Sequence, residues 1–293
     1  MSDVSVTTTK TRSNVDDVRA HYDLSNEFFA LFVDPTRTYS CAYFPRDDMT
    51  LQEAQVAKVD MTLDKLGLEP GMTLLDVGCG WGSVLKRAVE KYDVNVVGLT
   101  LSKNQHAYCQ EVLETVDSGR SHRALLGDWE EFTEPVDRIV IIEALEHFGF
   151  DRYDDFFRFA HQAMPSDGVM LLHSITALHP MQMQERGIPV TIDMAKFIRF
   201  ILTEIFPGAR LPSIEKVEEH CTKADFNVTR VHSLQSDFAQ TLDLWAEALQ
   251  SNKDEAVEIQ SEEVYERYLK FLTGCARAFR MGYIDCNQFT LEK

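Results

Sequence analysis

The middle of the chain alternates between short apolar runs and segments with the periodicity of a helix. The apolar, often β-branched runs predict five buried strands, at residues 73–78, 94–101, 123–126, 137–145 and 169–176. The helical segments between them are 83–92, 104–115 and 153–164. Continuous apolar strands separated by helices predict a parallel sheet covered on both faces. Right-handed crossovers then make the fold α/β and doubly wound.

The two ends of the chain depart from this alternation. Residues 1–14, rich in Ser and Thr, are expected to form a flexible leader, and residues 15–70 a helical cap. Further elements are expected towards the C-terminus: a strand at 226–234, helices at 242–249 and 264–278, and an edge strand at the final QFTLEK. The sheet should therefore be mostly parallel and seven-stranded, within one domain that spans residues 15–293.

Residues 178–215 interrupt the rhythm and are expected to form an inserted helical lid region. Its apolar positions follow i, i+3, i+4, i+7, i+8 and i+11, at Met194, Phe197, Ile198, Ile201, Leu202 and Ile205. This spacing predicts one amphipathic helix. Its apolar stripe either packs on the sheet or walls a channel for an apolar substrate.

Composition excludes several classes of function. The formal net charge of −18 disfavours binding to nucleic acid or to an anionic membrane surface. No run approaches the ~20 apolar residues of a membrane span, so an integral membrane protein is not expected. Six scattered cysteines without a C-x-x-C pair predict neither a disulfide framework nor a metal site, and indicate a cytoplasmic location.

The segment from Leu74 to Gly82, LLDVGCGWG, carries the clearest chemical signal. Glycines after a first strand let a ligand approach the backbone, and the next helix offers free N–H groups. The spacing G-x-G-x-G differs from the dinucleotide fingerprint G-x-G-x-x-G. With Asp76 before it, the loop resembles motif I of the class I S-adenosylmethionine (SAM) methyltransferases.

A more specific resemblance covers nearly the whole chain, from His21 to Lys293. The segments that carry it are HYDLSNEFFALFVDPTRTYSCAYF, LLDVGCGWG, GLTLSKNQ, EALEHFG, TEIFPG and LTGCARAF. They resemble the mycobacterial mycolic acid methyltransferases, which are related to the cyclopropane fatty acid synthases. The resemblance implies methyl transfer from SAM to a long meromycolyl chain, carried on acyl carrier protein. Basic residues near the channel mouth could dock that acidic carrier: Arg37, Arg186, Lys196, Arg199 and Arg210.

The resemblance also assigns roles to residues. SAM binding falls on Tyr39, Ser40, Leu74, Leu75, Asp76, Val77, Gly78, Cys79, Gly80, Trp81, Gly82, Thr100, Gln105, Trp129 and Glu130. In cyclopropane-forming members a bicarbonate ion is implied as the base, with ligands at Cys41, Glu146, His173 and a Tyr at position 238. Cys275 matches a cysteine marked as active in the wider family.

The chain departs from the cyclopropane-forming pattern at two positions. It has Phe238 in place of the Tyr, and Glu143 where those relatives usually have Gly. Both departures resemble the methoxy mycolic acid synthase branch, which methylates a hydroxyl. We therefore expect O-methylation of a meromycolyl hydroxyl; the alternatives are cyclopropanation of an alkene and a catalytically silent SAM- or lipid-binding scaffold.

The chemistry gives the candidate residues separate roles. Glu146 and His173 are expected to form the proton-accepting cluster, directly or through bicarbonate, and Glu143 to hydrogen-bond the substrate hydroxyl. A well-placed base accelerates such a transfer by about 10²–10⁴-fold. Each residue also has a purely structural alternative: Glu146 as a helix-dipole partner, and His173 as a core histidine. Cys275 could be structural, since direct transfer needs no covalent intermediate.

Overall fold

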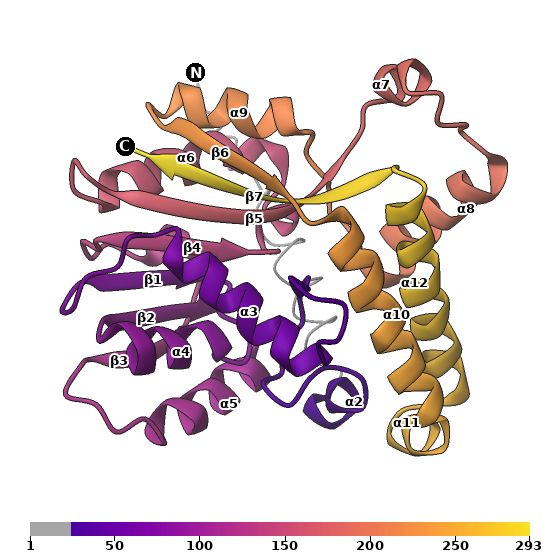
Figure 1. Ribbon diagram of the computed structural model, residues 1–293, viewed down its shortest axis with the longest axis horizontal. Helices are drawn as coiled ribbons and strands as arrows, with labels where there is room; N and C mark the ends of the chain where they lie inside the picture. The colour runs from indigo at the N-terminus through magenta and orange to yellow at the C-terminus, as the bar shows by residue number, and fades with distance from the viewer. Residues whose placement is uncertain (1–24) are drawn as a thin grey trace, which may run out of the picture.

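The computed structural model describes residues 25–293, and among these one mixed sheet of seven strands organises the fold (Figure 1). The strands are β1 (Thr73–Val77), β2 (Asn95–Thr100), β3 (His122–Leu126), β4 (Arg138–Ile142), β5 (Val169–Ala177), β6 (Asn227–Ser233) and β7 (Ile284–Glu292). Their order is β3-β2-β1-β4-β5-β7-β6. β1 to β5 are parallel, and β7 runs antiparallel to both β5 and β6. The expected doubly wound, mostly parallel sheet is confirmed.

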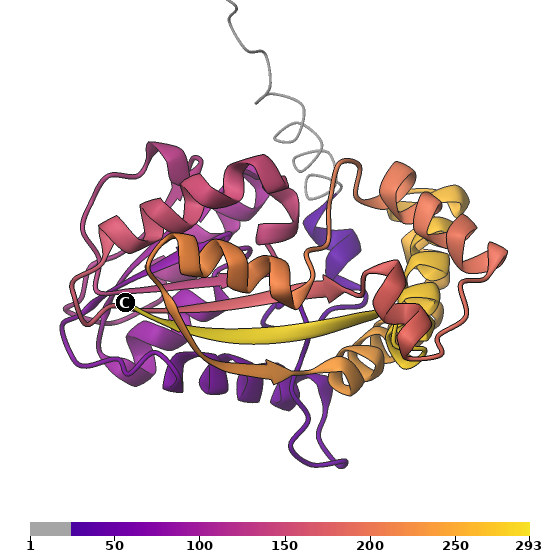
Figure 2. The ribbon, with the colours of Figure 1, turned by 90° about the horizontal axis from the view of Figure 1, so that it is seen from above.

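Helices cover both faces of the sheet, as Figure 2 shows from above. One face carries α3 (Leu51–Asp64), α4 (Ser83–Tyr92) and α5 (Lys103–Glu114). The other carries α6 (Tyr153–Ala163) and α9 (Ile214–Lys223), which pack on each other. Apolar strand residues such as Leu74 and Leu75 are buried between the layers because their side chains alternate between the two faces.

A helical layer lies beyond the carboxyl ends of the parallel strands. It consists of α2 (Asn26–Ala30), α7 (Pro180–Glu185), α8 (Ile192–Phe200), the π-helix η4 (Ile201–Ile205), α10 (Gln235–Ser251), α11 (Lys253–Ile259) and α12 (Glu262–Arg280). Three short turns complete the chain: η1 (Trp129–Glu131), η2 (Leu145–His147) and η3 (Phe150–Arg152). Among the described residues no helix is both long and apolar enough to cross a membrane.

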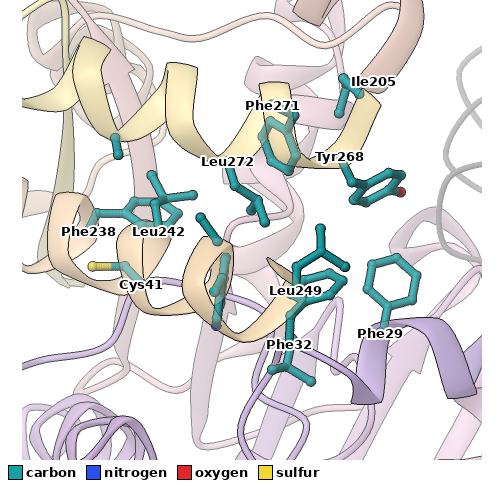
Figure 3. Close-up of a cluster of buried hydrophobic side chains, with 14 of the residues drawn as sticks. Phe29, Phe32, Cys41, Ile205, Phe238, Leu242, Leu249, Tyr268, Phe271 and Leu272 are labelled. Atoms are coloured by element: carbon teal, nitrogen blue, oxygen red, sulfur yellow. The ribbon is translucent and has the colours of Figure 1, made fainter. Parts of the chain in front are cut away.

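The helical layer has an aromatic core of its own, shown in Figure 3. Phe29, Phe32, Phe238, Tyr268 and Phe271 are buried there, in one cluster that also includes Trp81 from the glycine-rich turn. The rings of Phe28 and Tyr268 meet edge to face with centroids 5.0 Å apart. This cluster links α2, α10 and α12 to the end of the sheet.

One expectation about the outer elements is wrong, and a second needs refinement. The C-terminal strand is not at the edge, because β7 hydrogen-bonds β5 on one side and β6 on the other; the mostly exposed β6 is the edge strand. The helix expected at 194–205 is present, but its last turn is a π-helix. Gly274 of α12 lies directly under the Phe197 ring, so the apolar stripe of α8 packs on α12.

Some expected boundaries fall outside the structure or shift within it. The proposed leader 1–14, and the helical cap as far as residue 24, lie outside the described residues. The fourth strand ends at Ile142 and not at residue 145, because Glu143 has a φ of 51° and turns the chain. The helix expected at 242–249 extends over the whole of α10.

Candidate active site

A cleft opens at the carboxyl ends of β1, β2 and β4, with the glycine-rich turn as one wall. Gly78 and Gly80 have φ values of 86° and 53°, which only glycine adopts without strain. The N–H groups of Gly78 and Cys79 both donate to the Leu99 carbonyl, 2.9 Å away, which ties the turn to β2. A Cβ on Gly78 would lie 2.7 Å from the Ala144 Cβ, so the turn also requires a small residue.

Most residues expected to bind SAM line this cleft. They are Tyr39, Ser40, Asp76, Val77, Gly78, Cys79, Gly80, Trp81, Thr100, Gln105 and Trp129. The Thr100 hydroxyl donates to the Gln105 amide oxygen over 2.9 Å, which holds Gln105 at the cleft wall.

Four other residues in that set do not line the cleft. Leu74 and Leu75 alternate into the two buried layers. Gly82 precedes α4 and faces Cys109, whose Sγ would lie 2.7 Å from a Cβ at this position. The Glu130 carboxylate is exposed and pairs with Arg152 at 2.9 Å.

Further lining residues were not in the set expected to bind SAM. They are Arg37, Thr38, Lys58, Ser83, Val84, Leu99, Leu101, Ser102, Gly127, Ile142, Ala144, His147, Phe148 and Arg152, alongside Asp128. Several immediately follow a strand, which is the signal that could have found them. Arg152 pairs with Asp128 at 2.9 Å and lies 5.0 Å above the Trp129 ring, so it organises the wall opposite the glycines.

Lys58 is the most unexpected of these residues, because it is a fully buried lysine on α3. Its Nζ donates to the Ser40 Oγ over 2.7 Å. Burial lowers the pKa of Lys58, whereas the nearby Glu143 carboxylate raises it. The sequence gives a weak signal: Lys58 occupies the buried helix face that also carries Ala54 and Thr62.

The buried Asp76 Oδ2 and Trp129 Nε1 in the cleft have no hydrogen-bond partner among residues 25–293. Burial raises the pKa of Asp76 to about 7, and only Lys58 opposes this shift. A buried carboxylate without a partner fits a ligand that brings a cationic group, such as the ammonium group of SAM.

The wall next to Asp76 holds a cluster of groups from distant segments. The Glu143 Oε1 accepts the Cys41 backbone N–H at 2.7 Å and lies 3.3 Å from the His173 Nε2. The Glu146 Oε1 accepts the Ile175 N–H at 2.5 Å and the Ser174 hydroxyl at 3.0 Å. Glu143 lines the cleft, whereas His173 is fully buried behind it.

Glu143 has a backbone conformation that is unfavourable for residues other than glycine. Its φ of 51° is in the left-handed region, which costs a residue other than glycine roughly 1–2 kcal/mol. Strain of this kind concentrates at functional sites, where the surrounding structure enforces it. The Glu143 Oε2 makes no hydrogen bond within the described part of the chain, so the cleft offers one open carboxylate oxygen.

The electrostatics of the cluster favour proton exchange near neutral pH. Burial raises the pKa of Glu143 to about 7, although the Cys41 N–H and Lys58 oppose the shift. Burial likewise raises the pKa of Glu146 to about 7, and the negative charge of Glu143 adds to it. Burial lowers the pKa of His173 well below its usual value, so its ring is neutral.

The cysteines named from the sequence are poor nucleophiles. Cys41 contributes its backbone N–H, while burial raises the pKa of its thiol. Its Sγ lies within 4.8 Å of the Cys286 Sγ and a His173 ring nitrogen. Cys275 does not line the cleft: it packs against the aromatic core of the helical layer, and burial raises its pKa to about 12.

Phe238 lies close to this cluster, with aromatic rings packed around it. It shares the buried core with Cys41 and packs against Phe279, with ring centroids 4.7 Å apart. The position therefore provides no hydroxyl towards Glu143 or His173.

Comparison with known proteins then decides the family. A family model described as mycolic acid cyclopropane synthetase matches residues 9–289. The chain belongs to the mycolic acid cyclopropane synthetase family. The match spans the glycine-rich turn, the carboxylate cluster and the helical layer, and so accounts for the cleft and the helices beyond it together.

Individual members of the family are similar over most of their length. Methoxy mycolic acid synthase MmaA3 of Mycobacterium tuberculosis is 78% identical over all 293 residues of both chains. Cyclopropane mycolic acid synthase 1 of the same species is 65% identical over 276 residues, 94% of this chain and 96% of its own. The crystal structure of mycolic acid cyclopropane synthase CmaA1 complexed with SAH and CTAB superposes with a TM-score of 0.93 at 64% identity, covering 95% of this chain and 98% of that one.

Proposed function

We propose that this protein is a SAM-dependent methyltransferase that methylates a hydroxyl group on a long mycolic-type acyl chain, giving a methoxy group. The observation that carries the proposal is the carboxylate of Glu143, held at the cleft wall in a strained backbone conformation. The 78% identity to a methoxy mycolic acid synthase, against 65% to a cyclopropane synthase, supports the same choice.

The cleft residues match what SAM requires. When bound, SAM supplies an electrophilic methyl group on a sulfonium centre. Asp76 would pair with the ammonium group of its amino-acid part. The aromatic rings of Tyr39 and Trp129 would lie beside the sulfonium charge and the adenine ring of SAM. Thr100 and Gln105 offer neutral polar groups for the ribose hydroxyls, where many related enzymes have an acidic residue.

Glu143 is proposed to accept the proton that the substrate hydroxyl loses as its oxygen is methylated. Glu143 lines the cleft, its Oε2 makes no hydrogen bond within the described residues, and a pKa of about 7 suits a base that works near neutral pH. Glu146 is further from the cleft, and two protein donors already bind its Oε1. The proposal thus gives Glu143 the role that the sequence reasoning gave to Glu146 and His173.

No bicarbonate ion is included in this proposal. The Cys41 and Ile175 N–H groups, which could hold an anion, already donate to Glu143 and Glu146. Phe238 adds no hydroxyl, and two carboxylates would repel a further anion in a buried place. The carboxylate of Glu143 is therefore proposed to act as the base in place of a bicarbonate ion.

The acyl chain is proposed to lie between the cleft and the helical layer. Tyr39 and Trp81 line the cleft and also contact the aromatic core of that layer, so apolar surface continues from one to the other. An alkyl chain there gains about 0.8 kcal/mol for each CH₂ group that it buries.

The product of the reaction tests the proposal. The protein is incubated with isotope-labelled SAM and with hydroxylated or unsaturated long-chain acyl substrates, and the products are identified by mass spectrometry. We expect a methyl ether from the hydroxylated substrate. A cyclopropane from the alkene would establish the alternative activity, and SAM binding without turnover would establish a silent scaffold.

Variants at position 143 separate charge from shape. E143Q keeps the side-chain volume and should lower kcat by about 10²-fold or more while leaving the affinity for SAH unchanged. E143G relieves the positive φ and should raise the free energy of unfolding by about 1 kcal/mol while also losing activity. Full activity in E143Q would show that Glu143 is not the base.

Presentation of the substrate by acyl carrier protein, and a cytoplasmic location, are further parts of the proposal. Lys196 and Arg199 are exposed on α8 beside the exposed apolar side chains of Ile192, Ile198 and Leu202. In so acidic a chain, this basic and apolar face is a suitable surface for an acidic carrier. The six free thiols agree with a reducing compartment.

Charge reversal tests this docking. K196E/R199E should raise KM for carrier-bound substrate about tenfold without affecting detergent-dispersed free acid. Lys223 of α9, which lies on another face, provides the matched control as K223E. Equal KM values for both substrates in K196E/R199E would count against the carrier.

A further inference from the structure

A row of three polar side chains crosses the antiparallel part of the sheet behind Glu143. Gln288 on β7 is directly opposite His173 on β5 and His232 on β6. Gln288 and His173 are both fully buried. Residues opposite each other on neighbouring strands have side chains on the same face, so Gln288 can contact the histidine that contacts Glu143.

Two contacts fix the orientation of the Gln288 amide. The Lys65 Nζ, which can only donate, lies 2.6 Å from the Gln288 Oε1. The Thr62 hydroxyl donates its single hydrogen to the Lys58 carbonyl at 2.8 Å, so it must accept from the Gln288 Nε2 at 3.0 Å. Both contacts place the amide nitrogen on the side of His173.

This orientation determines where the proton of His173 lies. The Gln288 Nε2 is 3.1 Å from the His173 Nδ1, so Nδ1 accepts a hydrogen bond and carries no proton. A neutral imidazole has one protonated nitrogen, which must then be Nε2. The Cys286 Sγ at 2.9 Å and the Glu143 Oε1 at 3.3 Å are the acceptors that face Nε2–H.

The proton on Nε2 changes what His173 can do. An N–H group facing Glu143 stabilises the carboxylate and holds its Oε1, which leaves Oε2 without a hydrogen bond within the described residues. The opposite tautomer would point a lone pair at the carboxylate and repel it. His173 therefore cannot accept the substrate proton through the nitrogen that faces Glu143.

We propose that Gln288, oriented by Lys65 and Thr62, is a positioning residue that fixes the Nε2–H tautomer of His173 and thereby keeps Glu143 in place as the proton acceptor. The inference rests on the proposed function for its catalytic consequence. Its structural part, the tautomer of His173, is independent of the substrate.

Nuclear magnetic resonance of the full-length protein with ¹⁵N-labelled histidine tests the structural part without any substrate. The His173 signals are assigned by their loss in H173N. In the wild type we expect the shift of a protonated nitrogen at Nε2 and of an unprotonated one at Nδ1. In Q288E a carboxylate paired with Lys65 faces Nδ1 and should draw the proton there, which reverses the pattern.

Two further variants keep the test decisive. Q288M has nearly the volume of Gln but no donor, so it should give a mixture of tautomers even if Q288E folds poorly. T290V alters the buried Thr290, two residues further along β7 on the same face, and should leave the His173 signals unchanged. A protonated Nδ1 in the wild type, or an unchanged pattern in both Gln288 variants, would overturn the proposal.

Kinetics test the catalytic part with a readout that general destabilisation would not produce. Q288E should lower kcat for methyl transfer about 10²-fold, with KM and SAH affinity close to those of T290V. A reversed tautomer with unchanged kcat would refute the link to Glu143. If the wild type methylates no hydroxylated substrate, the proposed function fails while the tautomer result stands on its own.

Discussion

The two walls of the cleft are built in opposite ways. The wall from Asp76 to Gln105 comes from one continuous stretch of chain, in which a glycine turn and two strand ends present the Asp76 carboxylate, backbone groups and neutral side chains. The neighbouring cluster brings together Cys41, the segment with Glu143 and Glu146, and His173, and Gln288 lies 115 positions after the histidine that it contacts. The first wall depends on local geometry, whereas the second depends on the fold as a whole.

The walls also use positive φ values differently. At Gly78 the left-handed conformation is free of strain and brings backbone close to a ligand. At Glu143 the same region is strained, and the strain places a carboxylate where a glycine would leave a gap. One wall is therefore suited to binding and the other to chemistry.

The largest expected effect comes from a variant in the glycine turn of the first wall. G78A adds a Cβ 2.7 Å from Ala144 at a φ of 86°. We expect the turn to relieve the strain and the clash by moving away from the ligand. SAH affinity, measured by calorimetry, should then fall about 30-fold or more, because restoring the binding geometry costs roughly 2–3 kcal/mol. Tight binding in G78A would contradict the view that the turn must approach the ligand closely.

A second variant affects the helical layer and leaves the cleft intact. G274A places a Cβ 2.1 Å from the Phe197 ring, so α8 must move away from α12. The free energy of unfolding should fall by about 1–3 kcal/mol despite the better helix propensity of Ala. SAH affinity should stay within about twofold of the wild type.

Gly119 provides the control for this variant. A Cβ there meets no atom within 4 Å and the residue has no positive φ, so G119A should change stability by less than about 0.5 kcal/mol. Equal stability of G274A and G119A would show that α8 is not docked through Gly274.

The smallest expected effect is a pH dependence of binding at the first wall. Asp76 has a raised pKa of about 7, and a bound ammonium group favours its charged form. Affinity for SAH should therefore rise with pH up to about 7 and level off above it. Below that pKa, affinity should fall by up to tenfold per pH unit, with proton release on binding that calorimetry in different buffers detects.

D76N removes the titrating group and serves as the control. Its affinity for SAH should be lower and nearly independent of pH between about 5.5 and about 8. An unchanged pH profile in D76N would assign the effect to another group.

The sequence predicts the local features of the molecule well. The strands follow from apolar runs, and the turn at residues 78–82 follows from its glycines. Most of the first wall then follows from the rule that ligands bind at the carboxyl ends of parallel strands. The position of β7 was misjudged because a short terminal apolar segment does not reveal that it pairs on both sides.

The second wall shows the limit of such reasoning. The family resemblance named Cys41, Glu143, Glu146 and His173, but not which atoms meet. That Cys41 acts through its backbone N–H, and that Glu143 has the open oxygen, depends on contacts across 102 positions of the chain. Gln288 and Lys65 gave no signal at all, since an isolated Gln in a strand is usually an ordinary polar residue.

One short stretch of chain belongs to both walls. Residues 37–40 line the donor side of the cleft, and the next peptide group, at Cys41, holds the carboxylate of Glu143. A ligand that shifts Tyr39 therefore also shifts the hydrogen bond that holds the Glu143 carboxylate. We expect SAM, by fixing this stretch, to set the position of that carboxylate before the acyl chain enters.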